Sequence, residues 1–166
     1  VKAIAGGGGR GMAIVNLPED LNAAYEHCQV EAHAAFGNGA LYIERYLPRA
    51  RHVEVQVAGD GSEVIHFYER DCTVQRRNQK LIEIAPAPNL DPALRAQLLE
   101  SAVHIAHAAH YQSLGTFEFL IDVECGGIFF IEANPRIQVE HTITEEVTGI
   151  DLVQLQLRLA SGTTLK

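Results

Sequence analysis

Residues 128–141 constrain this chain more than any other part of its sequence. The stretch opens with the apolar run Ile-Phe-Phe-Ile, which predicts a buried strand, and then places polar side chains at every second position. Glu132 and Asn134 lie two residues apart, so on an extended chain their side chains share one face. Pro135 disfavours the helical conformation at Asn134, which keeps that residue extended or in a turn. The sequence therefore predicts a buried strand that ends in a polar site.

The same spacing continues beyond the strand with Arg136, Gln138 and Glu140. A strand end that carries carboxylates, amides and a guanidinium suits a site that holds a hard cation, an anion and a base together. The alternative is a solvated strand end with incidental charges. We favour the site, because so ordered a set is typical of a ligand-binding segment.

Two glutamates are predicted to meet across the last hairpin. Glu118 lies in the predicted strand 115–123, and Glu132 lies in the predicted strand 128–134. A turn centred on Cys125 would place them opposite one another on one face, with Cβ atoms about 5 Å apart. Two bare carboxylates so placed repel each other, and a divalent cation between them reverses the effect. We therefore predict that Glu118, Glu132 and Asn134 bind Mg²⁺ together with a nucleotide.

This metal site requires Glu118 and Glu132 to lie on one face of the hairpin, which depends on whether its loop has an odd or an even number of residues. A regular hairpin closed by a two-residue turn at Cys125 and Gly126 would place Glu118 and Glu132 on opposite faces. A loop with an odd number of residues, or a compensating bulge, would keep them on the same face.

A glycine-rich segment and a basic segment could hold the phosphates of such a nucleotide. Glycines at 6–9 and 11 lie between two predicted short strands, 1–5 and 12–15, with Lys2 and Arg10 on either side. Backbone N–H groups of such a loop can approach phosphate oxygens closely, although a flexible linker is the alternative. Residues 70–80 carry four basic side chains and one acidic one in a chain of net charge −8. We interpret them as a loop for an anionic ligand, with an ordinary solvated loop as the alternative.

The other elements follow ordinary signals for strand and helix. Residues 52–57 alternate strictly and predict a half-buried strand, with valines on the buried face and His52, Glu54 and Gln56 on the other. Further strands are predicted over 41–46, 63–69 and 81–84. Helices are predicted over 18–36, from the N-cap Asp91 to about residue 110, from a capping box of Thr142 and Glu145, and from the N-cap Asp151.

Bulk composition excludes several classes of protein. A length of 166 residues suits one domain or slightly more, and the charge of −8 argues against a nucleic-acid binder. No apolar run approaches the roughly 20 residues of a membrane span. The three cysteines predict neither a disulfide framework nor a zinc site, so a cytoplasmic setting is expected. The chain opens at Val1 inside an apolar run, so we expect it to be a piece of a longer protein.

The sequence resembles the biotin carboxylase component of biotin-dependent carboxylases, which has the ATP-grasp fold. The resemblance covers nearly the whole chain and is carried by Lys2 with 6–12, Glu44-Arg45-Tyr46-Leu47, Arg51-His52-Val53-Glu54-Val55-Gln56, 70–80, Gly115-Thr116-Phe117-Glu118-Phe119 and 131–141. Its most specific part is 136–141, because carbamoyl-phosphate synthetases share Asn-Pro-Arg but usually not the Gln-Val-Glu-His that follows. The resemblance implies an α+β fold with an antiparallel sheet core, flanking helices and part of a small lid subdomain. It assigns 1–46 to the lid and 47–166 to most of the core subdomain.

The resemblance also implies a reaction. In such enzymes ATP phosphorylates bicarbonate to carboxyphosphate, and the CO2 is transferred to N1 of biotin. Carried over by motif, the nucleotide contacts would be Lys2, Gly7, Gly8, Gly9, Glu44, Arg45, His52 and Gln75. Bicarbonate or the intermediate would be held by Lys80, Arg136, Gln138 and the backbone of Val139, and Glu140 would deprotonate bicarbonate. The implied cofactors are ATP and Mg²⁺ or Mn²⁺, and biotin is a substrate carried by a partner domain.

The implied partners are a biotin carboxyl carrier domain and a carboxyltransferase, in a parent enzyme that is expected to be oligomeric. The family's N-terminal domain and the C-terminal portion that faces biotin lie outside this chain, so the chain alone is expected to be inactive. Three positions depart from the family pattern: Asn78 replaces a common His, Arg45 a frequent Lys, and Pro135 a frequent Thr or Ser. The alternatives are a carbamoyl-phosphate synthetase-like ligase and a non-catalytic ATP-binding module. The intact set Glu118, Glu132 and Glu140 argues against the latter.

Overall fold

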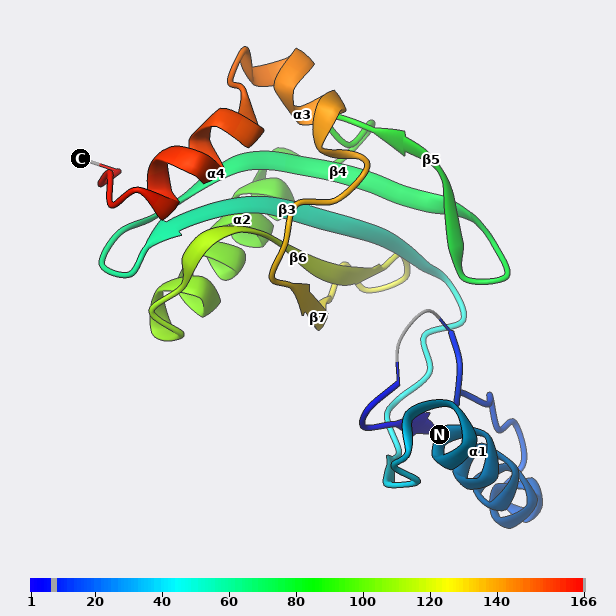
Figure 1. Cartoon of the computed structure of the whole chain (residues 1–166). Coiled ribbons are helices and arrows are strands. Elements are labelled where there is room, and N and C mark those ends of the chain that lie inside the picture. Colours follow the sequence, from blue (N-terminus) through cyan, green and yellow to red (C-terminus); the bar gives the residue numbers. More distant parts are fainter. Residues whose placement is uncertain (7–8, 166) are drawn as a thin grey trace. The chain divides into compact units, whose positions relative to one another are not determined.

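The structure, a computed structural model, describes residues 1–6 and 9–165, and it divides into two compact units (Figure 1). The first unit consists of Val1–Pro48 and Gln75–Gln79, and the second of Arg49–Val74 and Lys80–Lys166. Gly7 and Gly8, which the sequence assigned to phosphate binding, lie outside the described residues.

The first unit is a small α/β arrangement. Strand β1 (Lys2–Ala3) pairs antiparallel with β2 (Leu41–Tyr42), and the helices η1 (Pro18–Asp20) and α1 (Leu21–Phe36) lie between them in the sequence. The end of α1 at Gly37, with a left-handed φ of 70°, confirms the predicted stop. The strands predicted over 1–5 and 41–46 are too long, because of these described residues only Lys2–Ala3 and Leu41–Tyr42 are paired as strands. The strand predicted over 12–15 is reduced to a single β-bridge between Met12 and Lys2.

The second unit is built on a five-stranded sheet in the order β5-β4-β3-β6-β7. Its strands are β3 (Ala50–Asp60), β4 (Val64–Arg76), β5 (Gln79–Ile84), β6 (Gln112–Asp122) and β7 (Ile128–Asn134). β3 pairs antiparallel with β4 and β6, and β6 pairs antiparallel with β7. The helices are α2 (Pro92–Ala108), α3 (His141–Thr148) and α4 (Leu152–Ala160). The predicted α+β fold with an antiparallel sheet and flanking helices is confirmed.

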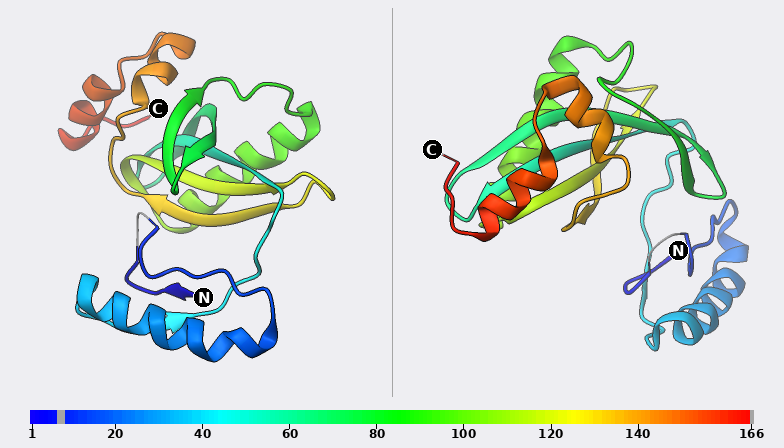
Figure 2. Two further views of the ribbon diagram at one scale, coloured as in Figure 1. Left: turned by 90° about the vertical axis from the view of Figure 1, so that its right-hand side faces the viewer. Right: turned by 45° about the horizontal axis from the view of Figure 1, so that its top comes forward.

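Helices cover both faces of this sheet, with α2 on one face and α3 and α4 on the other (Figures 1 and 2). Against α2 the sheet presents an apolar core that includes Val53, Val55 and Val57, all fully buried. Against α4 the core is small and centres on Ala58, Leu114 and Leu152. The prediction of a half-buried strand over 52–57 is therefore wrong. The side chains between the valines are also covered, because α3 and α4 return over them from the end of the chain.

Two local predictions are also wrong. Residues 70–80 do not form a loop, because β4 runs on to Arg76 and a tight turn at Arg77 and Asn78, with φ of 52° and 60°, leads directly into β5. Helix α3 begins at His141 without a side-chain cap, so the capping box is not formed. Glu145 Oε1 instead accepts a hydrogen bond from Leu152 N at 2.7 Å, at the start of α4.

The two aspartate N-caps are confirmed. Asp91 Oδ1 accepts hydrogen bonds from Ala93 N and Leu94 N, at 2.9 and 3.1 Å. Asp151 Oδ1 accepts one from Gln154 N, at 2.7 Å. Over the described part of the chain, no helix is long and apolar enough to cross a membrane.

Candidate active site

The hairpin of β6 and β7 brings Glu118 and Glu132 directly opposite each other, as predicted, but by a different route. Asp122 N donates to Gly127 O at 2.9 Å, which leaves four residues, 123–126, between this pair, so the turn is not centred on Cys125. Its register pairs Phe119 with Phe130, and a shift at the next step pairs Glu118 with Glu132. The extra residue, Ile131, is the compensating bulge that restores the parity the metal site needs.

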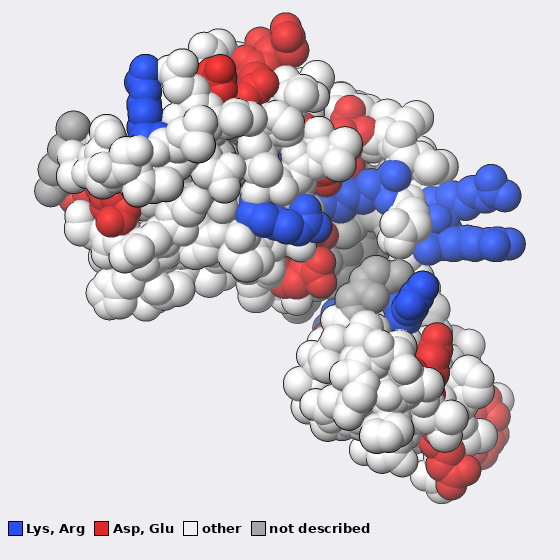
Figure 3. Space-filling model, in the orientation of Figure 1, with Lys and Arg blue, Asp and Glu red and all other residues white. Residues whose placement is uncertain are grey.

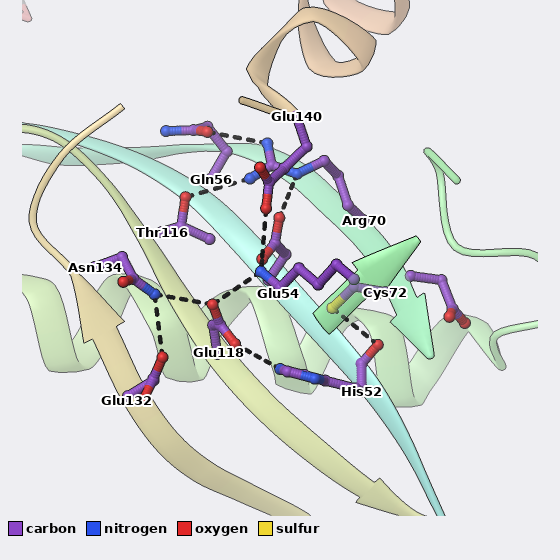
Figure 4. Close-up of polar contacts among 12 residues, drawn as sticks. His52, Glu54, Gln56, Arg70, Cys72, Thr116, Glu118, Glu132, Asn134 and Glu140 are labelled. Atoms are coloured by element: carbon purple, nitrogen blue, oxygen red, sulfur yellow. Dashed lines mark hydrogen bonds and ion pairs between the residues drawn. The ribbon is translucent and has the colours of Figure 1, made fainter. Parts of the chain in front are cut away.

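Asn134 joins the two carboxylates. Its Nδ2 donates to Glu118 Oε1 at 2.8 Å and to Glu132 Oε1 at 3.4 Å (Figure 4). Among the described residues no group of three His, Cys, Asp or Glu side chains is arranged to hold a metal ion. Two carboxylates and an amide nevertheless fit Mg²⁺, which takes one or two carboxylates and completes its shell with phosphates and water.

Glu118 is held as a carboxylate by contacts with His52 and Lys80. Its Oε2 lies 2.6 Å from His52 Nε2, and its Oε1 accepts from Lys80 Nζ at 2.9 Å. Burial raises the pKa of Glu118, but the hydrogen bonds from His52 and Lys80 and the charge of Lys80 outweigh it and lower the pKa to about 2. Glu118 is therefore an anion throughout the physiological pH range.

Lys80 contacts three carboxylates at once. Its ammonium donates to Glu54 through a short bond, to Glu118, and to Glu140 Oε1 at 3.1 Å. Burial lowers the pKa of Lys80, but the charge of Glu54 and the bonds to Glu54 and Glu118 raise it well above its usual range. For Glu140, burial raises the pKa, but a hydrogen bond from its own backbone N–H and the charge of Lys80 outweigh burial and lower the pKa overall. Glu140 is thus ionised and can accept a proton.

A fully buried arginine, Arg70, holds Glu54, one of the three carboxylates that contact Lys80. Arg70 Nε donates to Glu54 Oε1 at 2.5 Å, and the other hydrogen bonds of the guanidinium go to uncharged oxygens. These are Gln56 Oε1 at 3.0 Å, Thr144 Oγ1 at 2.8 Å and Thr116 Oγ1 at 3.2 Å. Because the hydrogen bonds come from β3, β6 and α3, they fix Glu54 beneath Lys80. Sequence reasoning placed Glu54 on an uncovered face and gave Arg70 no structural role. The period-two run of His52, Glu54 and Gln56 was the signal that could have found Glu54.

Three predicted residues follow β7 and lie in the segment that leads into α3. Gln138 is 7% exposed, and its Oε1 is buried without a hydrogen-bond partner in the described structure. Val139 is 90% exposed. Arg136 is exposed, and the hydrogen bond of its Nη1 goes to the carbonyl oxygen of Ile137 at 3.3 Å. The segment therefore presents an acceptor and a guanidinium that are not used for ion pairing within the described residues.

The remaining predicted residues lie in the first unit. Lys2 Nζ is 3.4 Å from Glu44 Oε1 and lies over the ring of Tyr42; burial lowers the pKa of Lys2, but the Glu44 charge raises it overall. Arg45 is exposed in the irregular segment after β2, and Gln75 is in the part of β4 that belongs to this unit. Gly9 has a φ of 81°, and a Cβ there would lie 2.9 Å from Asn78 Nδ2. The backbone conformation therefore favours glycine at this position, whereas the Asn78 side chain could move to make room for a Cβ.

Charges on the visible face of the second unit are mixed in sign, with Lys and Arg side chains lying beside Asp and Glu side chains (Figure 3). The site in this unit also contains side chains of both signs. Two basic side chains, Lys80 and Arg70, are surrounded by the carboxylates Glu54, Glu118 and Glu140. The carboxylates outnumber the basic side chains, so a small anion would approach through the ammonium of Lys80, and the carboxylates can hold a cation or accept a proton.

Comparison with known proteins gives a consistent result. The family model described as carbamoyl-phosphate synthase L chain, ATP binding domain, matches residues 1–166. Pyruvate carboxylase of Aspergillus niger is 51% identical over all of this chain and 14% of its own length. The mitochondrial pyruvate carboxylase of Homo sapiens is 51% identical over 99% of this chain and 14% of its own length. The chain thus spans about a seventh of these relatives.

Solved structures extend the similarity to three dimensions. A biotin carboxylase–β,γ-ATP complex from Campylobacter jejuni has a TM-score of 0.95 and 50% identity, over 99% of this chain and 37% of the other. The biotin carboxylase domain of the Hydrogenobacter thermophilus 2-oxoglutarate carboxylase, solved with MgADP, ADP and bicarbonate, has a TM-score of 0.92 and 49% identity. It matches 99% of this chain and 36% of the other.

Proposed function

This chain belongs to the carbamoyl-phosphate synthase L chain ATP-binding domain family and resembles its biotin carboxylase members throughout. We propose that it is the part of a biotin carboxylase that activates bicarbonate with ATP. In the parent enzyme the product, carboxyphosphate, would supply CO2 to N1 of biotin. The observation that carries the proposal is the Lys80 ammonium held between Glu54, Glu118 and Glu140, next to a carboxylate pair joined by Asn134.

The carboxylate pair is the proposed metal site. Glu118, Glu132 and Asn134 would hold Mg²⁺ or Mn²⁺, which neutralises the phosphoryl group as it is transferred. The two hydrogen bonds of Asn134 support this, since they bring the three side chains together from β6 and β7. His52 would keep Glu118 ionised and oriented through its 2.6 Å contact, in addition to its predicted place near the nucleotide.

Bicarbonate would bind between Lys80 and the segment after β7. Lys80 and Arg136 supply positive charge, and Val139, which would contribute its backbone, is an exposed residue. Gln138, whose Oε1 is buried without a hydrogen-bond partner in the described residues, would complete this anion site. Glu140, ionised and 3.1 Å from Lys80, would accept the hydroxyl proton of bicarbonate as general base. Lys80 would stabilise the charge that develops on the oxygen attacking the γ-phosphorus.

The first unit would supply the nucleotide lid. We propose that residues 1–46 form part of the lid and 47–166 most of the core subdomain. Lys2 and the glycine segment 7–9 would contact the phosphates, and Glu44, the backbone of Arg45 and Gln75 would contact the rest of the nucleotide. The left-handed φ of 81° at Gly9 is a conformation that favours glycine, as expected of a glycine-rich loop.

The partners of the parent enzyme are proposed on the same basis. They are a carrier domain bearing biotin and a carboxyltransferase, in an oligomer, as in the biotin-dependent carboxylases to which the chain is similar. The cytoplasmic setting stays a prediction, since the human relative is mitochondrial by name.

The test is ATP turnover by the parent enzyme with bicarbonate, biotin and Mg²⁺, compared with ammonia in place of biotin. Turnover should require bicarbonate and increase with biotin. Glu140→Gln should lower it by roughly 10²–10⁴-fold, the range for loss of a general base, and leave the affinity for Mg-ATP nearly unchanged. Turnover that depends on ammonia and not on biotin would overturn the proposal. An equal collapse of ATP affinity in Glu140→Gln would overturn the role of Glu140.

A further inference from the structure

Strand β5 carries a second carboxylate, Glu83, that the proposed chemistry does not use. It lies on the same strand as Lys80, and its side chain is half-buried. Both carboxylate oxygens are shielded from solvent and have no hydrogen-bond partner in the described part of the molecule. Buried carboxylates of this kind are unusual, because polar groups without water or a partner are costly.

The surroundings of Glu83 contain groups of both signs. The negative groups are Glu54 on β3 and Glu140 before α3, and the positive groups are Lys80 on β5 and Arg70 on β4. The Cys72 thiol on β4 is also near, and burial together with the charge of Glu54 raises its pKa far above the usual range. The thiol is therefore neutral. Lys80 and Arg70 already donate to Glu54, so neither compensates Glu83 with a hydrogen bond.

An ionised Glu83 would thus add an unpartnered negative charge beside Glu54 and Glu140. Under these conditions a carboxyl group holds its proton instead. Burial, followed by the charge of Glu54, raises the pKa of Glu83 to about 8. The group is consequently a neutral carboxylic acid at neutral pH, and it releases one proton to solvent as the pH passes this value.

We propose that Glu83 is a positioning residue whose protonated form is required for bicarbonate to bind beside Lys80. This inference rests on the proposed function of the site. Bicarbonate is an anion, and the ammonium of Lys80 must attract it while it is already shared by three carboxylates. A fourth negative charge at Glu83 lowers the local potential further and draws the ammonium away from the substrate. Protonated Glu83 leaves the existing balance of charge intact.

The expected consequence is an alkaline limit on substrate binding rather than on chemistry. As the pH rises through about 8, Glu83 ionises and the KM for bicarbonate increases. A like charge at Glu83, in a partly screened site, should weaken anion binding at Lys80 by about tenfold. The kcat at saturating bicarbonate changes much less, because Glu140 is already ionised at these pH values.

The experiment is the pH dependence of the KM for bicarbonate between about pH 7 and 9.5 in the parent enzyme, for the wild type and for Glu83→Gln. Gln has the shape of the neutral acid but cannot ionise, so the variant should match the wild type at pH 7 and keep a constant KM where that of the wild type rises. Glu83→Leu should also have a constant KM, since the charge and not the hydrogen-bonding group matters. Glu100→Gln, the same change at an exposed position on α2, should behave as the wild type.

Infrared difference spectra of wild type minus Glu83→Gln give a second readout. A protonated carboxyl band should be present at pH 7 and lost at high pH. An equal rise of KM in wild type and Glu83→Gln, or absence of the band at pH 7, would overturn the inference. If the wild type lacks bicarbonate-dependent ATP turnover at every pH, the proposed function is wrong, and the role of Glu83 in bicarbonate binding is wrong with it. The two failures are therefore distinguishable.

Discussion

The two faces of strand β3 are equally buried and chemically opposite. Val53, Val55 and Val57 face α2, and Glu54 and Gln56 face α3 and α4, yet all five are fully buried. On the α2 face, burial of apolar surface stabilises the fold directly. On the other face, each buried group needs a partner, and Arg70 supplies partners to two strands and a helix.

This difference indicates what each face is for. A buried ion pair contributes little net stability, because desolvation of the charges offsets most of their attraction. The Arg70–Glu54 pair is therefore better explained as a support for Lys80 than as a contribution to the stability of the core. The α2 face holds the sheet together, and the opposite face holds charges at fixed positions.

The largest effect is expected from breaking the buried ion pair. Arg70→Leu leaves the carboxylate of Glu54 in a solvent-free position with Lys80 as its remaining cationic partner. The free energy of unfolding should fall by about 3–5 kcal/mol, the usual cost of removing one partner of a buried ion pair. Urea denaturation of the wild-type chain and the variant measures this difference.

A double variant sharpens the interpretation. Glu54→Leu combined with Arg70→Leu removes both charges, and apolar replacement of a buried pair is often neutral or stabilising. We expect it to recover most of the stability lost in Arg70→Leu while the parent enzyme loses bicarbonate-dependent turnover. If the double variant is as unstable as the single one, the hydrogen bonds of Arg70 to Gln56, Thr116 and Thr144 carry the stability instead.

A smaller effect is expected one residue further along the same strand. Val55→Ala removes two buried carbon atoms on the α2 face and should lower the free energy of unfolding by about 2 kcal/mol. The variant keeps every charge of the site in place, so turnover per folded parent enzyme should be unchanged. Urea denaturation and steady-state assays at saturating substrate measure the two quantities. A large fall in turnover would show that the two faces are not functionally separate.

Sequence reasoning recovered what depends on local signals. The stop at Gly37 and the caps at Asp91 and Asp151 depend on neighbouring residues, and the structure contains all three. The pairing of Glu118 with Glu132 also follows from the hairpin, because two adjacent strands restrict each other to few registers. The bulge at Ile131 was not located, since the run Phe-Phe-Ile does not indicate which residue is extra.

What was missed depends on distant parts of the chain. Alternation along β3 shows which residues share a face, but not what covers that face. The covering helices lie more than eighty residues later in the sequence, so Glu54 was taken for an uncovered residue. Arg70 had no local sign of burial, because its partners come from β3, β6 and α3. Glu83 was missed for the same reason, since its lack of partners is a property of the folded chain.

The smallest effect is expected at the edge of the α2 face, where a charged pair does occur. Arg51 Nη2 donates to Asp71 Oδ2 at 2.5 Å and to Pro88 O at 2.8 Å, which ties β4 to the segment before α2. Burial raises the pKa of Asp71, but hydrogen bonds from Thr73 and Arg51 and the charge of Arg51 lower it overall. Because the folded pKa lies below the unfolded one, the stabilisation is fully present above the unfolded pKa of about 4. The stabilisation is lost as the pH falls through the pKa of Asp71 in the folded protein.

Asp71→Asn should therefore lower the free energy of unfolding by about 1 kcal/mol at pH 7, and the difference from wild type should shrink as the pH falls below about 4. Urea denaturation across this pH range measures it, with Glu100→Gln on the exposed side of α2 as the control. A deficit that stays constant down to low pH would mean that Asp71 acts through packing, and that charge contributes to neither stability nor its pH dependence on this face.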